Sequence, residues 1–220
     1  MIRIPYIALP RLSSIDDVAP QLFEQVPAHP IACACWKKDF PYTPRVEMKI
    51  AHTPSHLLLR YDVQENSIRA RYTQYNQPVW TDSCVELFAS LDGNQTYYNF
   101  EFSCIGTPLL RYNVKPHEGD LASPQVLDGI LTRSSLGRQP IEEVKNGEVS
   151  WQLTVAIPYA AFFAHRLTNL RGQRFSANFY KCGDELAEPH YLSLFPISTP
   201  TPNFHTPEFF QPLDVLYREK

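Results

Sequence analysis

The sequence lacks any long apolar run, and its first ten residues lack the pattern of a secretory signal. Across its 220 residues, no apolar stretch approaches the roughly 18 residues needed to cross a bilayer. The stretch Met1–Pro10 lacks the basic start, apolar core and small-residue cleavage site of a secretory signal. We therefore expect a soluble chain with no membrane partner. The chain as given favours the cytoplasm, and a periplasmic or cell-surface location stays open if an export signal has been removed.

Clusters of basic residues are also missing. The 20 Lys and Arg residues are scattered among 23 Asp and Glu residues, and the longest basic run is Lys37-Lys38. A protein that neutralises phosphates needs a basic patch or stripe. The sequence therefore predicts no nucleic-acid partner.

Cysteine motifs and glycine-rich loops are absent as well. The five cysteines form no C-x-x-C pair, and Cys84, Cys104 and Cys182 fall inside strand-like runs. This placement is more typical of small buried apolar residues in a reducing compartment than of disulfides or a zinc site. The eight glycines form neither G-x-G-x-x-G nor a P-loop, and no G-x-S-x-G occurs, which argues against nucleotide and serine-hydrolase chemistry.

The sequence is rich in aromatic residues and in period-two alternation. It has 13 Phe, 12 Tyr and 3 Trp, and 44% of its residues are hydrophobic, enough for a large core. Alternation of apolar and polar residues recurs between positions 45 and 195 and predicts an all-β fold, a β-sandwich or jelly roll with one or two short helices. Eight strands are expected: Arg45–Ala51, Leu57–Gln64, Cys84–Leu91, Tyr97–Cys104, Leu109–Asn113, Ser150–Ile157, Arg174–Lys181 and Tyr191–Phe195.

Two short helices are expected, at Ser14–Val26, which Pro20 interrupts, and at Pro158–Ala164. No internal repeat or second domain is visible. We expect one domain over residues 1–220, with a core at about 31–217 and residues 1–30 packing on it as an extension.

Two other segments are expected to be irregular. Pro116–Gly147 is loop-like, apart from a possible short strand around Ile130. The proline-dense stretch Pro196–Pro212 should run extended or turned over a surface, because proline fixes its own φ and disfavours helix in the preceding residue.

A hairpin between positions 84 and 104 carries the most information. Gly93 and Asn94 both tolerate positive φ, and placing them at the centre of a two-residue turn fixes the strand register. One face then holds the apolar residues Val85, Leu87, Ala89, Leu91, Phe100, Phe102 and Cys104. The other holds Glu86, Phe88, Ser90, Tyr97, Asn99 and Glu101.

The same register places Glu86 directly opposite Glu101. Like charges so placed destabilise a sheet, so we expect something to offset the repulsion. The candidates are an arginine, a bound cation, a shared proton, or a ligand rich in hydroxyl donors. Alternatively, the register is off by two residues and the glutamates never meet. The arginines considered are Arg60, Arg69, Arg71 and Arg111.

Aromatic residues are expected at the edge of this polar face. Trp80 and Asp82 precede the first strand and should lie at its rim, where a tryptophan can stack on a sugar or seal the core edge. In the proline-rich tail, Asn203, Phe204 and His205 lie between rigid prolines, with Phe204 expected to be exposed.

The segment VWTDSCVELF, from Val79 to Phe88, resembles the signature strand of the family 9 carbohydrate-binding modules. WQLTVAIP at 151–158 and PNFHTPEFFQPL at 202–213 resemble later segments of that family in the same order. The resemblance spans roughly Arg45–Leu216 and is greatest to stand-alone domains of gut bacteria. It implies a β-sandwich that binds a mono- or oligosaccharide between two aromatic side chains, without catalysis, in polysaccharide catabolism.

Carried over by position, the resemblance assigns Trp80 and Phe204 as the two aromatic residues and Glu86 as a polar contact. Asn99, Glu101 and Asn203 complete the expected carbohydrate-binding set. Three positions depart from the family pattern: Cys84 interrupts the D-S-V-E spacing, Phe204 replaces a tryptophan, and Glu101 occupies the place of an arginine.

No catalytic residue and no metal ligand is expected among the site residues. The resemblance allows a structural calcium ion, for which Asp92, Asp184 and Glu185 are the candidate oxygen ligands.

Two alternative functions stay open. A glycoside hydrolase could use Glu86 and Glu101, because retaining enzymes hold their carboxyl groups about 5–5.5 Å apart. A haem- or other cofactor-binding sandwich is the other alternative, although Met48 is the only methionine besides Met1 and no C-x-x-C-H motif occurs.

Overall fold

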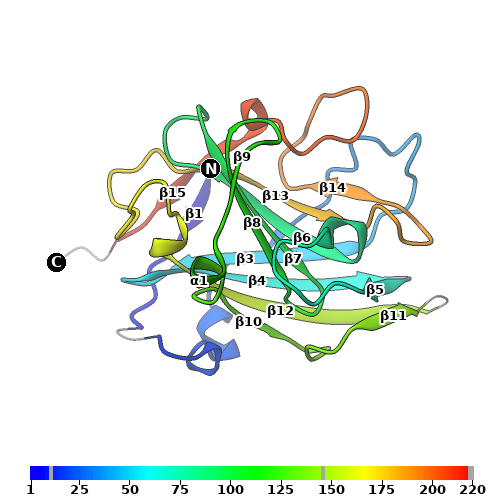
Figure 1. The fold of residues 1–220 in the computed structure, drawn as a ribbon, viewed down its shortest axis with the longest axis horizontal. Coiled ribbons are helices and arrows are strands. Elements are labelled where there is room, and N and C mark those ends of the chain that lie inside the picture. The colour runs from blue at the N-terminus through cyan, green and yellow to red at the C-terminus, as the bar shows by residue number, and fades with distance from the viewer. Residues whose placement is uncertain (10–11, 145–146, 218–220) are drawn as a thin grey trace.

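Two β-sheets packed against each other make up most of the fold in the computed structural model, which describes residues 1–9, 12–144 and 147–217 (Figure 1). The first sheet has the strand order β1-β15-β13-β6-β7-β8-β9, and β14 pairs with β13. Its strands are β1 (Ile2–Ile4), β6 (Cys84–Ser90), β7 (Tyr97–Ser103), β8 (Pro108–Lys115), β9 (Glu118–Leu121), β13 (Ser176–Cys182), β14 (Tyr191–Ser193) and β15 (Gln211–Val215).

The second sheet has the order β10-β12-β4-β3-β2, and a separate two-stranded ribbon pairs β11 with β5. These strands are β2 (His29–Pro30), β3 (Arg45–His52), β4 (His56–Glu65), β5 (Ile68–Ala70), β10 (Leu131–Ser134), β11 (Ile141–Val144) and β12 (Val149–Pro158). The helical elements are one turn of α-helix, α1 (Pro124–Leu127), and the 3-10 turns η1 (Ile15–Asp17), η2 (Pro20–Phe23), η3 (Val79–Thr81), η4 (Tyr159–Ala161) and η5 (Pro207–Phe209). No helix in the described part of the chain is long and apolar enough to cross a bilayer.

The prediction of an all-β sandwich is confirmed. The eight predicted strands correspond to β3, β4, β6, β7, β8, β12, β13 and β14, and each observed end lies within two residues of the predicted one. The strand expected around Ile130 is present one residue later as β10.

The expected helices are shorter than predicted. The segment 14–26 forms two 3-10 turns, η1 and η2, because Pro20 lacks the N–H that a continuous helix would need there. After Pro158 only η4 forms. The segment 116–147, expected to be mostly loop, contains β9, α1 and β11 besides β10.

Alternation along the strands divides the apolar residues between two faces of the first sheet. Leu87, Phe100 and Phe179 face the second sheet and pack in the main core with Leu59 and Trp151. On the opposite face, a second cluster gathers around Phe88, Tyr97 and Tyr180 and includes Trp36, Phe204 and Phe210. The chain around Trp36 and the proline-rich tail cover this outer face, so it is partly a second core.

The N-terminal residues pack on both sheets. β1 pairs in parallel with β15, which places the first and last strands side by side (Figure 1). Ile2 and Ile4 belong to the main core, while Val18 and Phe23 pack with Leu58 on the second sheet.

Candidate functional site

The hairpin register predicted from Gly93 and Asn94 is confirmed. Both residues have positive φ, 80° and 69°, and the strands pair Val85 with Phe102 and Glu86 with Glu101. Glu86 and Glu101 therefore face each other on the outer surface of the first sheet.

A cavity of about 590 Å³ lies over this outer face. Its walls come from β6, β7 and β8, from η3, from the turn after β13 and from the proline-rich tail. All six predicted site residues line this cavity: Trp80, Glu86, Asn99, Glu101, Asn203 and Phe204. Segments distant in sequence are thus brought together in one concave site, the usual form of a small-ligand site.

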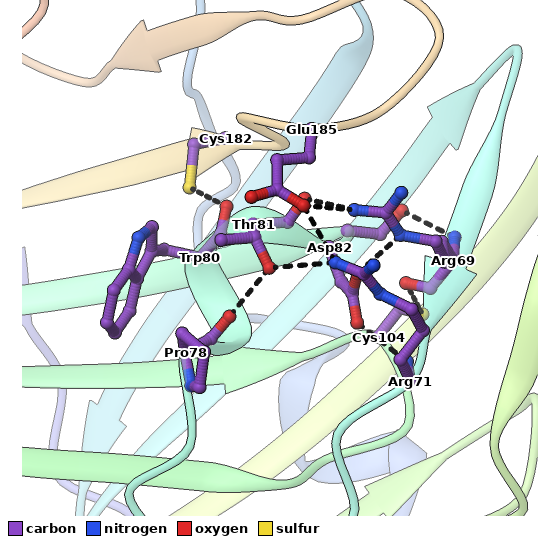
Figure 2. Close-up of polar contacts among 10 residues, drawn as sticks. Arg69, Arg71, Pro78, Trp80, Thr81, Asp82, Cys104, Cys182 and Glu185 are labelled. Carbon is purple, nitrogen blue, oxygen red and sulfur yellow. Dashed lines mark hydrogen bonds and ion pairs between the residues drawn. The ribbon is translucent and has the colours of Figure 1, made fainter.

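Trp80 is held at the rim of the cavity by the turn η3. Thr81 N–H and Oγ1–H both donate to the carbonyl of Pro78, at 3.2 and 2.8 Å. Trp80 is 38% exposed. Figure 2 shows it pointing away from the polar network on the other side of the turn. An exposed indole fixed by its backbone supplies a flat apolar surface for a ligand.

The prediction that Asp82 lies at the rim of the polar face is wrong. Asp82 is fully buried and forms ion pairs with Arg69 and Arg71 (Figure 2). Its Oδ2 accepts the backbone N–H of Arg71 at 2.6 Å, and Arg69 also donates to the carbonyl of Thr81 at 3.0 Å. η3 makes the chain turn before β6 begins, so strand alternation does not extend back to Asp82. Its role is to anchor the turn that presents Trp80.

Phe204 is less exposed than predicted, at 9%. Its ring stacks on Tyr180, with centroids 4.1 Å apart and planes 6° from parallel, and it also contacts Trp36. One face of Phe204 is therefore already covered within the protein. Trp80 and Phe204 both line the cavity, but only Trp80 offers a largely open ring.

The two facing glutamates are buried, and burial raises the pKa of both carboxyl groups. Burial is the largest cause for Glu101, whose pKa rises to about 7, while for Glu86 the neighbouring Glu101 adds to the effect of burial. Hydrogen bonds hold them in place: Asn99 Nδ2 donates to Glu101 Oε1 at 2.7 Å, and Cys182 Sγ donates to Glu86 Oε1 at 3.1 Å. Asn113 Nδ2 in turn donates to Asn99 Oδ1 at 2.7 Å.

Of the candidate partners, no arginine forms an ion pair with either glutamate within the described residues. Arg60 pairs with Asp62, whereas Arg69 and Arg71 pair with Asp82 and Glu185. Arg111 lines the cavity and lowers the pKa of Glu101 from a distance, against the larger effect of burial. The carboxyl pair is thus only weakly compensated.

The cavity also contains polar side chains that the sequence did not assign to it. They include Asp184 after β13, Arg111 on β8, His117 in the β8–β9 turn and His205 in the tail. His205 Nδ1 lies 2.8 Å from the hydroxyl of Tyr97, and its ring centroid is 3.9 Å from that of His117. Burial raises the pKa of Asp184 to about 6. The sequence offered a signal for Arg111, as a candidate partner of the two glutamates, and for His205, next to Phe204. Asp184 and His117 reach the cavity through tertiary packing.

The three candidate calcium ligands do not form one site. Asp92 caps the β6–β7 turn, with its Oδ1 and Oδ2 accepting from Thr96 at 3.1 and 2.7 Å. Glu185 pairs with Arg69 and Arg71. Asp184 is directed to the cavity instead. These residues do not fit a shared calcium ion.

Comparisons with known proteins agree with this arrangement. A solved structure of a provisionally assigned carbohydrate-binding protein from Bacteroides uniformis ATCC 8492 is 39% identical, with a TM-score of 0.92 and 98% of each chain covered. A family 9 carbohydrate-binding module from Caldicellulosiruptor kristjanssonii, solved with glucose, has a TM-score of 0.62 at 9% identity, over 99% of this chain and 97% of that one. Its complex with cellotriose has a TM-score of 0.59 at 9% identity, over 99% and 95%. At that identity these two structures show a shared fold.

No curated protein matches the chain significantly. The model of the family described as "Carbohydrate-binding family 9" matches residues 17–215, nearly the whole chain. Together with the close relative from Bacteroides uniformis, this match shows that the chain belongs to carbohydrate-binding family 9.

Proposed function

We propose that this protein binds carbohydrate without catalysis, in the cavity framed by Trp80 and Phe204. The observation that carries the proposal is that an exposed, anchored indole shares one cavity with carboxyl, amide and guanidinium groups. Membership of the family supports it, as do the glucose and cellotriose complexes of the Caldicellulosiruptor module.

The chemistry of the cavity suits a sugar. The C–H faces of a sugar ring are apolar and can stack on Trp80. Its hydroxyl groups need protein partners that both donate and accept hydrogen bonds. Asn203 and Arg111 offer donors near the rim, and Glu86, Asn99 and Glu101 form a polar floor. Because Phe204 is mostly covered by Tyr180, Trp80 contributes the larger stacking surface and Phe204 closes the opposite side.

The contacts of Glu101 weigh against the alternative of a glycoside hydrolase. A retaining enzyme needs one carboxyl group to reach the anomeric carbon and the other to reach the leaving oxygen. Here Oε1 of Glu101 is held by Asn99, and Oε2 is buried beneath the cavity surface. The pair is adjacent, as hydrolysis would require, but it is not presented for attack.

Tryptophan fluorescence offers a direct test. Trp36 and Trp151 are buried, at 5% and 1% exposure, so quenching or a spectral shift on adding sugar reports mainly on Trp80. Glucose, cellotriose and a panel of other oligosaccharides would be titrated into wild type and Trp80→Ala, with calorimetry giving the affinity of the variant. We expect Trp80→Ala to weaken binding by roughly 5- to 150-fold, since losing an aromatic stacking contact removes about 1–3 kcal/mol.

Tyr75→Ala is the matched control, because Tyr75 is an exposed aromatic residue, at 40%, outside the lining of the cavity. Its affinity should equal that of wild type. Absence of binding across the panel, or equal affinity of Trp80→Ala and wild type, would overturn the proposal.

A further inference from the structure

Two cysteines and a glutamate meet at the floor of the cavity. Cys84 on β6 and Cys182 on β13 are direct cross-strand partners, and Glu86 lies two residues after Cys84 on the same face of the sheet. One ligand atom from each, the two Sγ atoms and a carboxylate oxygen, lie within 4.8 Å of one another. Among the residues that the structure describes, this is the one group of three or more such side chains.

The spacing suits a tetrahedral metal ion. Zinc binds sulfur at about 2.3 Å and carboxylate oxygen at about 2.0–2.2 Å, so ligand atoms around it lie roughly 3.5–4 Å apart. Cys182 Sγ and Glu86 Oε1 are 3.1 Å apart and no two of the three ligand atoms are more than 4.8 Å apart, so shifts of up to about 1 Å would bring them to a common ion. Two thiolates with one carboxylate select a thiophilic divalent ion such as zinc over calcium or magnesium, which prefer oxygen ligands.

An independent observation is a buried oxygen without a partner beside this group. Glu101 Oε2 is buried, in a side chain that is 4% exposed, and it has no hydrogen-bond partner within the described residues. It belongs to the carboxyl group that faces Glu86 across the strands, and no described basic side chain forms an ion pair with either. A cation bound at Glu86 would stabilise the ionised form of this carboxyl pair, which burial disfavours and to which Arg111 contributes only from a distance.

The site would be closed on one side and open on the other. Cys84 is fully buried, whereas Cys182 and Glu86 line the cavity. Zinc sites that bind a water molecule or a ligand oxygen have this arrangement: the protein supplies three ligands, and the fourth position faces a cavity.

We propose that Cys84, Cys182 and Glu86 form a binding site for a zinc-class divalent ion, with its fourth position directed into the cavity. The thiol protons leave to solvent when the ion binds. The proposal does not depend on carbohydrate binding, because all three ligands belong to the protein.

Cobalt(II) titration of the reduced, metal-free protein tests the site. We expect one equivalent of Co²⁺ to bind with tetrahedral visible bands and a near-ultraviolet thiolate-to-cobalt charge-transfer band. Cys84→Ser and Cys182→Ser should each lose roughly half of that charge-transfer band, since each removes one of two thiolates. Glu86→Gln should keep the band but bind Co²⁺ and Zn²⁺ at least tenfold more weakly.

Cys104→Ser is the control, because Cys104 is also fully buried but donates to the carbonyl of Arg69, outside the cluster. Its titration should match that of wild type. If Cys84→Ser fails to fold, Cys182→Ser and Glu86→Gln decide, together with the rise in melting temperature that Zn²⁺ should give to wild type and not to Cys182→Ser. Absence of a charge-transfer band in wild type, or an unchanged band in Cys182→Ser, would overturn the proposal, whatever the outcome of sugar titrations.

Discussion

Lys181 and Glu65 form an ion pair between the two sheets, with Nζ and Oε2 2.8 Å apart and neither side chain exposed. Glu65 Oε1 also accepts from Trp151 Nε1 at 2.7 Å, and Lys181 Nζ lies 2.8 Å from His190 Nε2. Each charge is tolerated in the interior because the other is present.

Removing only one partner should therefore be costly. We expect Lys181→Met to lower the free energy of unfolding by about 3–5 kcal/mol, since it leaves Glu65 uncompensated in the core. The double variant Lys181→Met/Glu65→Leu should recover much of that loss. Denaturant unfolding of the three proteins measures both effects, and a single variant as stable as wild type would contradict this account.

Asp82 should matter for both stability and the position of Trp80. Asp82→Asn keeps the size of the side chain but leaves Arg69, only 10% exposed, without its buried counterion, so we expect a loss of about 3 kcal/mol. Trp80 should also become more mobile, as measured by its fluorescence anisotropy. Glu185→Gln is the control: its side chain is 57% exposed, and we expect a change below about 1 kcal/mol.

Comparing substitutions at two glycines distinguishes destabilisation by backbone strain from destabilisation by steric overlap. Gly106 and Gly137 both have positive φ, 85° and 78°, so replacing either with a residue that has a Cβ strains the backbone. A Cβ on Gly106 would lie 2.7 Å from Thr132 Oγ1, whereas one on Gly137 would meet nothing within 4 Å. Gly106→Ala should be more destabilising than Gly137→Ala by about 1–3 kcal/mol. Equal melting temperatures of the two variants would show that the loop around Gly106 relaxes freely.

His205 predicts a dependence of stability on pH. Burial, with smaller effects of His117 and Arg111, lowers the pKa of His205 to about 3 from its ordinary value of 6.5. Between these values the unfolded chain binds a proton that the folded chain does not, so the contribution of neutral His205 is complete above pH 6.5 and is lost as pH falls towards 3.

His205→Gln should remove this dependence. As pH falls below 6.5, the stability of wild type should decline more steeply than that of the variant, by up to about 1.4 kcal/mol per pH unit. Urea unfolding at several pH values compares the slopes, and an NMR titration follows His205 directly. Parallel slopes, or a His205 that titrates near pH 6.5, would refute the assignment.

Local patterns were sufficient for the hairpin and for most of the long strands. Alternation and the Gly93-Asn94 turn are properties of a few consecutive residues, so they predicted the pairing of Glu86 with Glu101 correctly. The short strands β5, β9 and β11 carry too few residues to show alternation. β9 forms by pairing with the edge of β8, and β5 and β11 pair with each other across about 70 residues of sequence, so their signal is not local.

The parts of the site that depend on distant packing could not be read from the chain. Asp82 differs from the prediction because two arginines from the other side of η3 reach it. Phe204 is covered because Tyr180 lies beneath the tail, and no local signal couples those two positions. Cys84 and Cys182 likewise lie opposite each other because β6 pairs with β13.

The order of the strands also affects how the chain reaches its native state. The hairpin of β6 and β7 can form from neighbouring residues, but the other edge of β6 pairs with residues 176–182, and residues 2–4 pair with 213–215. Such distant contacts slow folding, and until β13 is available β6 presents an open, apolar edge of the kind that aggregates. During synthesis the chain should therefore be most prone to aggregation between the emergence of β7 and that of β13.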